Sequence, residues 1–339
     1  MRISNTANVL REAIKTNKKL IKDGVNPNKM ITPFLVGDPG IGKTSIVEQV
    51  ADELGVECRS VIIAQYDPAD LAGLPIVENS TYVRTRPNWL PDDGEGILFL
   101  DELVQACTMS QNLMAQLINE RRIGEHELGE GWVIVAAGNK SSNKAGTSQM
   151  PSHLKDRLMT LEVEANLDDT VAYFNKSGIN EKICGYLRYR PDKIAEFDAS
   201  ADACPSPRSW ARMDTVIEWD LSAFEEFEAM KGTVGEAAAN DFKAFQEIFY
   251  KMPDPDGVIA NPKGAEIPSD PAIKYALMAA LAARADAKRI PAILKYVDRI
   301  KDQEFAALLI KDSLSRDPGL VKNKDFQVWA RGPGKDLLK

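Results

Sequence analysis

The chain has 339 residues, of which 44% are hydrophobic and 27% charged, and its formal net charge is −8. This length is too great for one small core, so we expect more than one domain. The composition is that of an ordinary globular protein. The negative charge argues against nonspecific nucleic-acid binding as the main task, because such binding needs an excess of basic side chains.

Several further absences narrow the class of protein. The four cysteines are scattered without a CxxC pair and there are only two histidines, so we expect neither a zinc site nor a disulfide framework. No window approaches the roughly 20 consecutive apolar residues of a membrane span. The N-terminal stretch MRISNTANVLREAIKTNKKL lacks the apolar region of a signal peptide. We therefore expect a cytoplasmic protein with no membrane partner.

The first predicted elements are a helix and a glycine-rich loop. Ser4 or Asn5 can cap a helix that ends near Gly24, with its lysines on a solvated face. The loop GDPGIGKT, residues 37–44, follows an apolar strand and precedes a helix. Backbone N–H groups at a helix N-terminus bind anions, and glycines let the chain close around a phosphate.

This loop has the pattern of a nucleoside triphosphate site. In this pattern Lys43 reaches the β- and γ-phosphates and the Thr44 hydroxyl binds Mg²⁺. We expect these residues to contact the nucleotide: Asp38, Pro39, Gly40, Ile41, Gly42, Lys43, Thr44 and Ser45.

An insertion follows the next strand, predicted at residues 58–65. Residues 66–73 read as a short helical turn, and residues 76–84 read as a hairpin around Asn79-Ser80. The sequence RPNWLP, residues 86–91, ends this insertion. A simple nucleotide-binding sheet does not need this insertion.

Two carboxylates end the next buried strand, ILFLDE at residues 97–102. Ligands of open α/β sheets bind at the carboxyl ends of the strands, so these acids point to the same site as the phosphate loop. Asp101 is suited to the Mg²⁺ shell and Glu102 to the activation of a water. A solvated turn is the alternative for an acidic pair taken alone.

A polar amide ends the strand after that. Residues 132–137 (WVIVAA) are followed by Gly138 and Asn139, whose amide could orient the attacking water. Residues 141–149 are polar, and we expect them to be mobile. Residues 158–163 form the last strand. Strands that alternate with helices predict a parallel sheet with crossover helices.

The pattern after Glu164 is helical. Ser206 can cap a helix that has Pro207 at its first position. Arg208 then lies in the first turn, where the helix dipole disfavours a cation, which suggests contact with a phosphate; a solvent-exposed arginine is the alternative. From residue 235 onwards, apolar stripes predict a third, helical region whose side chains form a core, with residues 252–271 as a loop.

Taken together, these motifs resemble an AAA+ ATPase of the MoxR-like family, in the clade with an insertion in helix 2. GDPGIGKT matches the Walker A motif and ILFLDE matches Walker B. AAGNK has Asn139 at sensor 1, LKDRL has Arg157 at the arginine finger, and SPRSW has Arg208 at sensor 2. The excursion at residues 67–91 matches the helix-2 insert. Arg157 is followed by Leu158, where the family usually has Phe.

The resemblance implies an α/β P-loop NTPase core with a five-stranded parallel sheet and helices on both faces. We expect this AAA+ subdomain at residues 1–165, a helical lid at 166–234 and a C-terminal helical region at 235–339. It also implies a hexameric homo-oligomer that hydrolyses Mg·ATP to ADP. In that ring Glu102, Asn139 and Arg208 act in cis and Arg157 acts on the neighbour's ATP.

The resemblance also implies a partner. Family members remodel or activate a protein, commonly one with a von Willebrand factor A domain, and the insert with Tyr82 and Trp89 would face the pore or that partner. Arg121 or Arg122 is a further candidate to cross the subunit interface.

Three alternatives remain open. A nucleic-acid motor or loader is suggested by Arg84, Arg86 and the lysines of the first helix. A scaffold that binds ATP without hydrolysis conflicts with the Asp101-Glu102 pair. A small-molecule kinase would have no use for the sensor and finger positions.

Overall fold

The computed structural model describes residues 1–140, 150–335 and 337. The predicted mobile stretch at 141–149 lies outside these residues. The chain forms two compact units, Met1–Glu164 and Ala165–Lys339, which are described separately below.

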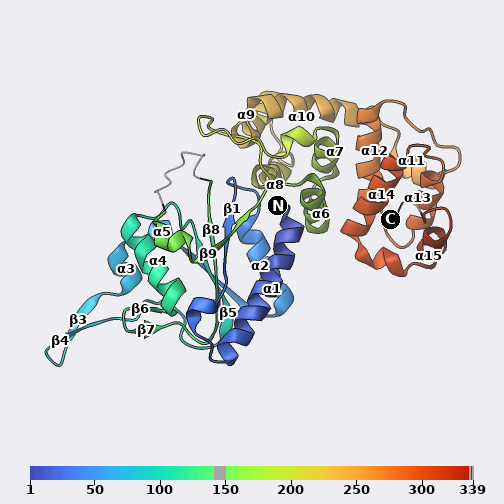
Figure 1. The fold of residues 1–339 in the computed structure, drawn as a ribbon. Coiled ribbons are helices and arrows are strands. Elements are labelled where there is room, and N and C mark those ends of the chain that lie inside the picture. The colour runs from blue at the N-terminus through green and yellow to red at the C-terminus, as the bar shows by residue number, and fades with distance from the viewer. Residues whose placement is uncertain (141–149, 336, 338–339) are drawn as a thin grey trace. The chain divides into compact units, whose positions relative to one another are not determined.

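Unit 1 is built on the expected five-stranded parallel sheet, with the strand order β2-β5-β8-β1-β9 (Figure 1). Because β1 lies between β8 and β9, its carboxyl end, where the phosphate loop begins, lies between the ends of these two strands. The sheet strands are β1 Thr32–Val36, β2 Glu57–Ile62, β5 Glu95–Asp101, β8 Gly131–Gly138 and β9 Leu158–Glu162.

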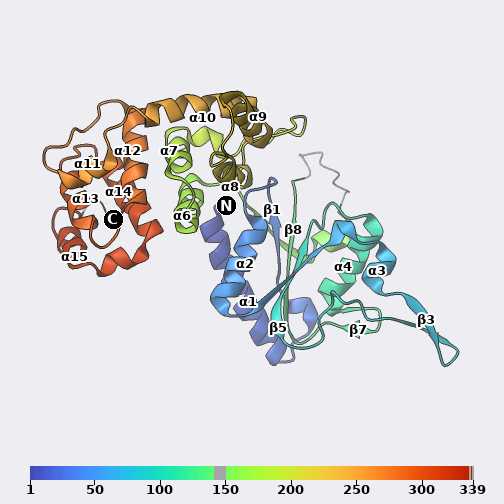
Figure 2. The same ribbon diagram turned by 180° about the vertical axis from the view of Figure 1, so that it is seen from behind.

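Helices cover both faces of this sheet, as predicted (Figures 1 and 2). Alternate strand residues such as Phe34, Leu98 and Ile134 join the core cluster that includes Leu71 of α3 and Met114 of α4. The opposite face is covered by α1 and α2, which contact β8 and β5. The helices of unit 1 are α1 Ile3–Lys22, α2 Lys43–Leu54, α3 Pro68–Ala72, α4 Thr108–Glu120 and α5 Ser152–Lys155, with short 3₁₀ turns η1 Pro27–Lys29 and η2 Ile63–Gln65.

The start of α1 differs from the prediction. The helix begins at Ile3, with Arg2 at the cap position and no side-chain cap bond, so neither Ser4 nor Asn5 is the cap. The reason lies in tertiary structure, because the backbone of Arg2 forms a parallel bridge with Glu164 and so fixes the chain direction two residues before Ser4. The end of the helix near Gly24 is confirmed.

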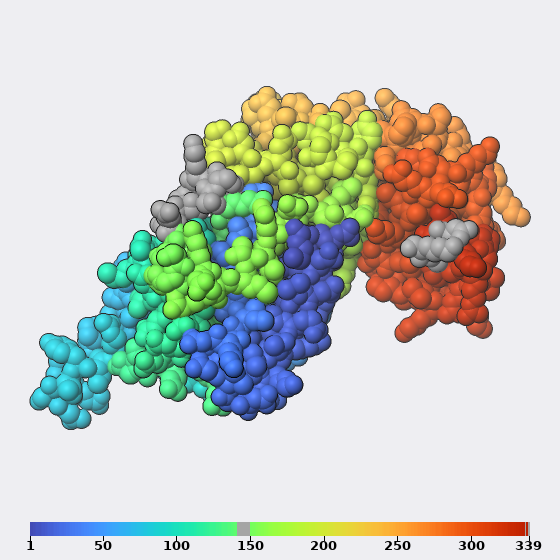
Figure 3. Space-filling view, in the orientation of Figure 1, coloured from blue at the N-terminus to red at the C-terminus, as the bar shows by residue number. Residues whose placement is uncertain are grey.

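Two β-hairpins extend from the helices of unit 1. The predicted hairpin is β3 Pro75–Glu78 with β4 Thr81–Arg84, and Asn79 and Ser80 at its turn both have positive φ angles, of 50° and 63°. In Figure 3 it is the cyan projection of unit 1. The second hairpin, β6 Arg122–Ile123 with β7 His126–Glu127, was not predicted.

The insert exposes only one of the two aromatic residues that we expected at a pore or partner. Tyr82 on β4 is 84% exposed, whereas Trp89 is buried in the main core of unit 1. The expectation for Trp89 was therefore wrong. The segment RPNWLP returns the chain to the core, and an indole there supplies a large apolar area.

Unit 2 is entirely helical in the residues described. The predicted boundary between residues 234 and 235 does not coincide with a break between compact units, because Phe242 and Phe245 of α10 share one core with Trp210 of α8 and Tyr186 of α7. A second core cluster lies among α11 to α15. The helices are α6 Leu167–Ser177, α7 Glu181–Tyr189, α8 Pro207–Val216, α9 Ala223–Val234, α10 Glu236–Phe249, α11 Pro255–Ala260, α12 Pro271–Ala283, α13 Ile290–Val297, α14 Gln303–Arg316 and α15 Lys324–Arg331, with 3₁₀ turns η4 Pro191–Lys193 and η5 Pro318–Lys322.

A buried ion pair joins two helices of unit 2. The Arg188 guanidinium on α7 donates two hydrogen bonds to the Asp312 carboxylate on α14, and their side chains are only 6% and 2% exposed. Asp168 on α6 accepts a further bond from Arg188.

None of the helices in the described part of the chain is long and apolar enough to cross a membrane.

Candidate nucleotide site

The phosphate loop joins β1 to α2 as the sequence predicts. Gly40 and Gly42 have φ angles of 77° and 100°, a region that residues with a Cβ atom rarely adopt, and Gly42 is the residue immediately before α2. At Gly37 an added Cβ atom would lie 2.5 Å from both the Val163 carbonyl oxygen and the Ile41 side chain. The three glycines therefore have different roles: Gly37 permits close packing and the other two permit the turn.

Lys43 points its ammonium group back into this loop. Its Nζ donates to the carbonyl oxygens of Gly37 (2.8 Å) and Asp38 (2.9 Å) and to Asn139 Oδ1 (3.0 Å). Asn139 follows β8, so this contact joins the loop to the tip of the neighbouring strand. A buried cation beside a helix N-terminus, with these neutral acceptors, can bind the oxygens of a phosphate.

Thr44 and Asp101 form the second contact across the site. The Thr44 hydroxyl donates to Asp101 Oδ2 at 2.9 Å, which brings the first turn of α2 to the end of β5. A hydroxyl and a carboxylate are hard oxygen donors, and Mg²⁺ binds through few protein ligands while it keeps several waters. This pair therefore fits the metal that we predicted, with the remaining positions for water and phosphate.

Glu102 occupies an unusual backbone conformation. Its φ angle is 54°, in the left-handed region, and its N–H donates to Asp101 Oδ1 at 2.8 Å. The next residue fixes the turn, because the Leu103 N–H donates to the Ala137 carbonyl oxygen of β8 at 3.0 Å. Such a conformation costs about 1–3 kcal/mol and persists only where the surroundings enforce it. The turn gives the two acidic side chains different positions: Asp101 contacts Thr44, and Glu102 remains partly exposed beyond it.

The other loop residues that we predicted differ in their exposure. Asp38, Pro39 and Ser45 are partly exposed around the loop, whereas Ile41 is buried and packs below it. Their contacts to a nucleotide stay predictions.

Arg157 lies at the other end of the sheet. It precedes Leu158, which pairs with Thr32 at the start of β1, while the phosphate loop follows the end of β1. The length of β1 therefore separates Arg157 from the phosphate loop of its own chain. Its guanidinium donates to the His153 carbonyl oxygen of α5.

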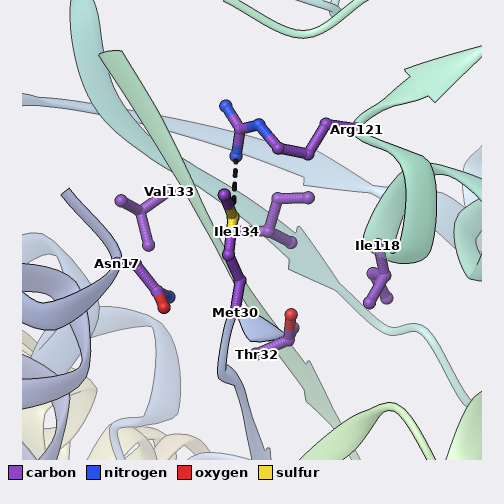
Figure 4. Close-up of a pocket in the computed structure, with 7 residues that line it drawn as sticks. All are labelled: Asn17, Met30, Thr32, Ile118, Arg121, Val133 and Ile134. Carbon is purple, nitrogen blue, oxygen red and sulfur yellow. Dashed lines mark hydrogen bonds between the residues drawn. The ribbon is translucent and has the colours of Figure 1, made fainter. Parts of the chain in front are cut away.

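The two neighbouring arginines after α4 differ sharply. Arg121 turns inward: its guanidinium donates to the Gly129 carbonyl oxygen (2.8 Å) and to Met30 Sδ (3.9 Å), beside a small pocket that Ile118 also lines (Figure 4). Burial lowers the pKa of Arg121. Arg122 is exposed and pairs with Glu120. Of the two, Arg122 is the more exposed, and a role across a subunit interface stays a prediction for either.

Arg208 lies in unit 2, in the first turn of α8. The Ser206 cap is confirmed, because Ser206 and Ser209 form a reciprocal capping box, and Pro207 is the first helical residue. The Arg208 side chain is exposed. Its contact with a nucleotide in unit 1 stays a prediction.

The described site and its sequence match one family model. Residues 33–160 match the model of the ATPase family associated with various cellular activities, AAA. Residues 33–160 are an AAA family ATPase domain. Proteins of this family hydrolyse ATP to ADP and usually use Mg²⁺, and the contacts of Lys43, Thr44 and Asp101 fit such ligands.

Curated relatives match a shorter stretch of this chain. It is 31% identical over 91 residues to the Holliday junction branch migration complex subunit RuvB of Synechococcus sp. (strain CC9902), and 32% identical over 91 residues to the protein of that name from Parasynechococcus marenigrum (strain WH8102). Each match covers 26% of this chain and 22% of the relative, so the chain aligns with about a fifth of their length.

Solved structures are similar over a longer range. The Thermotoga maritima RuvB Holliday junction branch migration motor is 16% identical, with a TM-score of 0.39 over 81% of this chain and 80% of that chain. NtrX from Brucella abortus in complex with ADP is 15% identical, with a TM-score of 0.37 over 97% of this chain and 68% of that chain.

Proposed function

We propose that Glu102 is the general base of ATP hydrolysis in this chain. The observation that carries this proposal is the pair of contacts that converge beside Glu102: Thr44 with Asp101, and Lys43 with Asn139. Mg²⁺ held by Thr44 and Asp101 would neutralise charge on the phosphates. Lys43 binds phosphate oxygens, Asn139 orients a water, and Glu102 accepts the proton of that water.

The test is the Glu102→Gln variant, which keeps the size and the backbone turn but removes the base. We expect kcat to fall by about 10²–10⁴-fold while ATP still binds. Glu130→Gln, at an exposed position outside the site, is the matched control and should hydrolyse ATP normally. Hydrolysis by Glu102→Gln at the wild-type rate would show that another residue is the base.

We further propose that the ATPase works as a homo-oligomer, with a hexameric ring as the expected state. Arg157 cannot serve the phosphate loop of its own chain, since β1 lies between them, so its guanidinium would act on ATP bound to a neighbour. A cation supplied at the γ-phosphate stabilises the charge of the transition state. Arg208, in the same proposal, contacts the nucleotide of its own chain.

A mixing experiment tests the shared site. An Arg157→Ala subunit keeps the proposed base, Glu102, but cannot supply an arginine to its neighbour's ATP. A Glu102→Gln subunit lacks the base but can still supply Arg157 to its neighbour. Each variant alone should be inactive, and a mixture of the two should regain activity. An inactive mixture, with both variants still assembling, would argue against action of Arg157 in trans.

The proposed task of the ring is to remodel or activate a protein partner, for which a von Willebrand factor A domain protein is the candidate. The β3–β4 hairpin supports a protein as the partner. Opposite residues Val77 and Tyr82 are 70% and 84% exposed, and Ile76 is 45% exposed. Residues 75–84 hold one acidic and one basic residue, so the hairpin offers apolar contact without an excess of positive charge.

A nucleic-acid motor is the second candidate, favoured by the similarity to RuvB, a subunit of a Holliday junction branch migration complex by its name. The two arginines that suggested nucleic-acid binding form hydrogen bonds within the chain. The Arg84 guanidinium donates to the Gly73 carbonyl oxygen, and the Arg86 guanidinium donates to the Glu127 carbonyl oxygen. ATPase assays with branched DNA, duplex DNA and RNA across a salt series separate the candidates. Stimulation that fades with salt would support the motor, and no stimulation at low salt would exclude it.

A further inference from the structure

The two hairpins of unit 1 meet at one residue, Arg84, the last residue of β4. Its N–H donates to Glu125 Oε1 at 2.6 Å, and its carbonyl oxygen accepts a bond from His126 Nε2 at 2.9 Å. Glu125 lies in the turn of the β6–β7 hairpin, and His126 is the first residue of β7. The main chain of Arg84 is therefore held on both its donor and its acceptor by two consecutive residues, Glu125 and His126.

Further bonds surround this contact. Across the base of the β3–β4 hairpin, the Thr85 N–H donates to the Leu74 carbonyl oxygen at 2.9 Å. The Arg86 guanidinium donates to the Glu127 carbonyl oxygen at 2.8 Å. Every one of these bonds lies at the base of the hairpin, and its strands from Ile76 to Val83 project beyond them (Figure 3). A two-stranded hairpin has little stability of its own, so its direction depends on its base.

The β6–β7 hairpin connects this base to the nucleotide site through the chain. It follows α4 directly, and α4 begins shortly after the Asp101-Glu102 turn. After β7, Leu128 is buried in the core and donates its N–H to the Arg121 carbonyl oxygen at 2.7 Å, which closes the hairpin against the end of α4. The chain then enters β8, which leads to Asn139. The β6–β7 hairpin thus lies, along the chain, between the Asp101-Glu102 turn that precedes α4 and Asn139, which follows β8.

We propose that Glu125 and His126 are positioning residues that couple the ATP site to the β3–β4 hairpin, so that the bound nucleotide sets how firmly the hairpin is held. This proposal rests on the proposed function, in which the hairpin contacts the partner. Neither residue touches the phosphate loop, Asp101, Glu102 or Asn139. Their effect is transmitted through the Arg84 main chain alone.

Hydrogen–deuterium exchange of residues 75–84 tests the coupling in the full chain, with ADP and with a non-hydrolysable ATP analogue. In the wild type we expect slower exchange with the analogue than with ADP. In Glu125→Ala and His126→Ala, exchange should become about tenfold faster and equal in the two states, because the restraint on Arg84 is lost. Glu125→Gln keeps an oxygen acceptor and should restore the nucleotide dependence.

Glu127→Ala is the matched control, because only the carbonyl oxygen of Glu127 enters the contact, and it should behave as the wild type. ATP hydrolysis is measured on the same samples. The alanine variants should hydrolyse ATP within about twofold of the wild-type rate, since they touch no part of the site. Failure of the proposed ATPase chemistry would appear in the Glu102→Gln assay and would leave this exchange result unchanged.

Two results would overturn the proposal. The first is exchange of residues 75–84 in the wild type that does not depend on the nucleotide. The second is a nucleotide dependence that persists in Glu125→Ala. A thermal unfolding curve for each variant shows that the protein is folded, and if Glu125→Ala unfolds, a nucleotide dependence that persists in His126→Ala would overturn the proposal.

Discussion

Lys43 Nζ lies 3.0 Å from Asn139 Oδ1, which joins the first residue of α2 to the residue that follows β8. The two groups come from positions 96 residues apart in the chain. A γ-phosphate bound at this contact would lie beside both groups. Lys43 would bind the negatively charged phosphate oxygens, and Asn139 would orient the neutral attacking water.

The first prediction concerns that amide. Asn139→Ala should lower kcat by about 10²-fold, the usual cost of losing one oriented polar group at a transition state, with little change in ATP affinity. Steady-state hydrolysis and equilibrium binding of a fluorescent ATP analogue measure the two effects. Lys43→Ala is the contrasting variant and should lose ATP binding itself. Equal loss of binding in both variants would contradict the separate roles.

The second prediction concerns the buried ion pair of unit 2. Asp312→Asn should destabilise the protein by about 3–5 kcal/mol, because it leaves Arg188 charged and buried. The double variant Arg188→Leu/Asp312→Leu should recover most of this loss, since it removes both charges together. Urea unfolding followed by tryptophan fluorescence gives the free energies. An Asp312→Asn variant as stable as the wild type would show that Asp168 alone satisfies Arg188.

The third prediction is a pH dependence of stability. Burial raises the pKa of Asp168, but the hydrogen bonds from Lys311 and Arg188 outweigh it and lower this pKa to about 2. An unfolded aspartate titrates near 3.9. The contribution of Asp168 is therefore fully present above about pH 4 and is lost as the pH falls towards 2.

Asp168→Asn should thus be less stable than the wild type at neutral pH, and the difference should shrink below about pH 4 and vanish below about pH 2. Unfolding free energies of both proteins across this range provide the measurement. Asp202→Asn, at an exposed position, should show no such convergence. A difference that stays constant from neutral pH to pH 2 would be inconsistent with the lowered pKa of Asp168.

The fourth prediction concerns cysteine reactivity. Cys107 is exposed at the start of α4, and a hydrogen bond from the Ser110 side chain, together with one from the Ser110 backbone, lowers the pKa of its thiol. Burial raises the pKa of Cys58 to about 11 and that of Cys184 to about 12. Iodoacetamide near neutral pH should therefore modify Cys107 first.

Peptide mass spectrometry over a time course checks the order of modification. Cys107→Ser should remove the fast phase, and Ser110→Ala should slow it without removing it. Faster labelling of Cys184 would mean that the α7 core opens more readily than its burial indicates.

Local patterns in the sequence were enough to predict the sheet and most of the site. The apolar runs that precede the phosphate loop, Asp101 and Asn139 all finish at one edge of a parallel sheet, so the polar residues that follow them lie close together. The turn at Asn79-Ser80 was predictable for a similar reason, since short polar residues tolerate positive φ angles.

Features that depend on distant contacts were not predictable. The start of α1 is set by the bridge between Arg2 and Glu164, which no local cap signal reveals. The sequence around Trp89 does not distinguish a partner-facing aromatic from a buried one. The β6–β7 hairpin has two residues in each strand, too few for an alternating pattern, although Gly124 with its φ of 56° marks the turn.

The strand order of unit 1 also has a consequence for biosynthesis. β1 is made early but lies between β8 and β9, and its hydrogen-bond partners end at Gly138 and Glu162. While the ribosome synthesises the intervening residues, β1 has no strand to pair with. The sheet can close only after Glu162 has left the exit tunnel, so this unit should depend on chaperone protection for most of its translation.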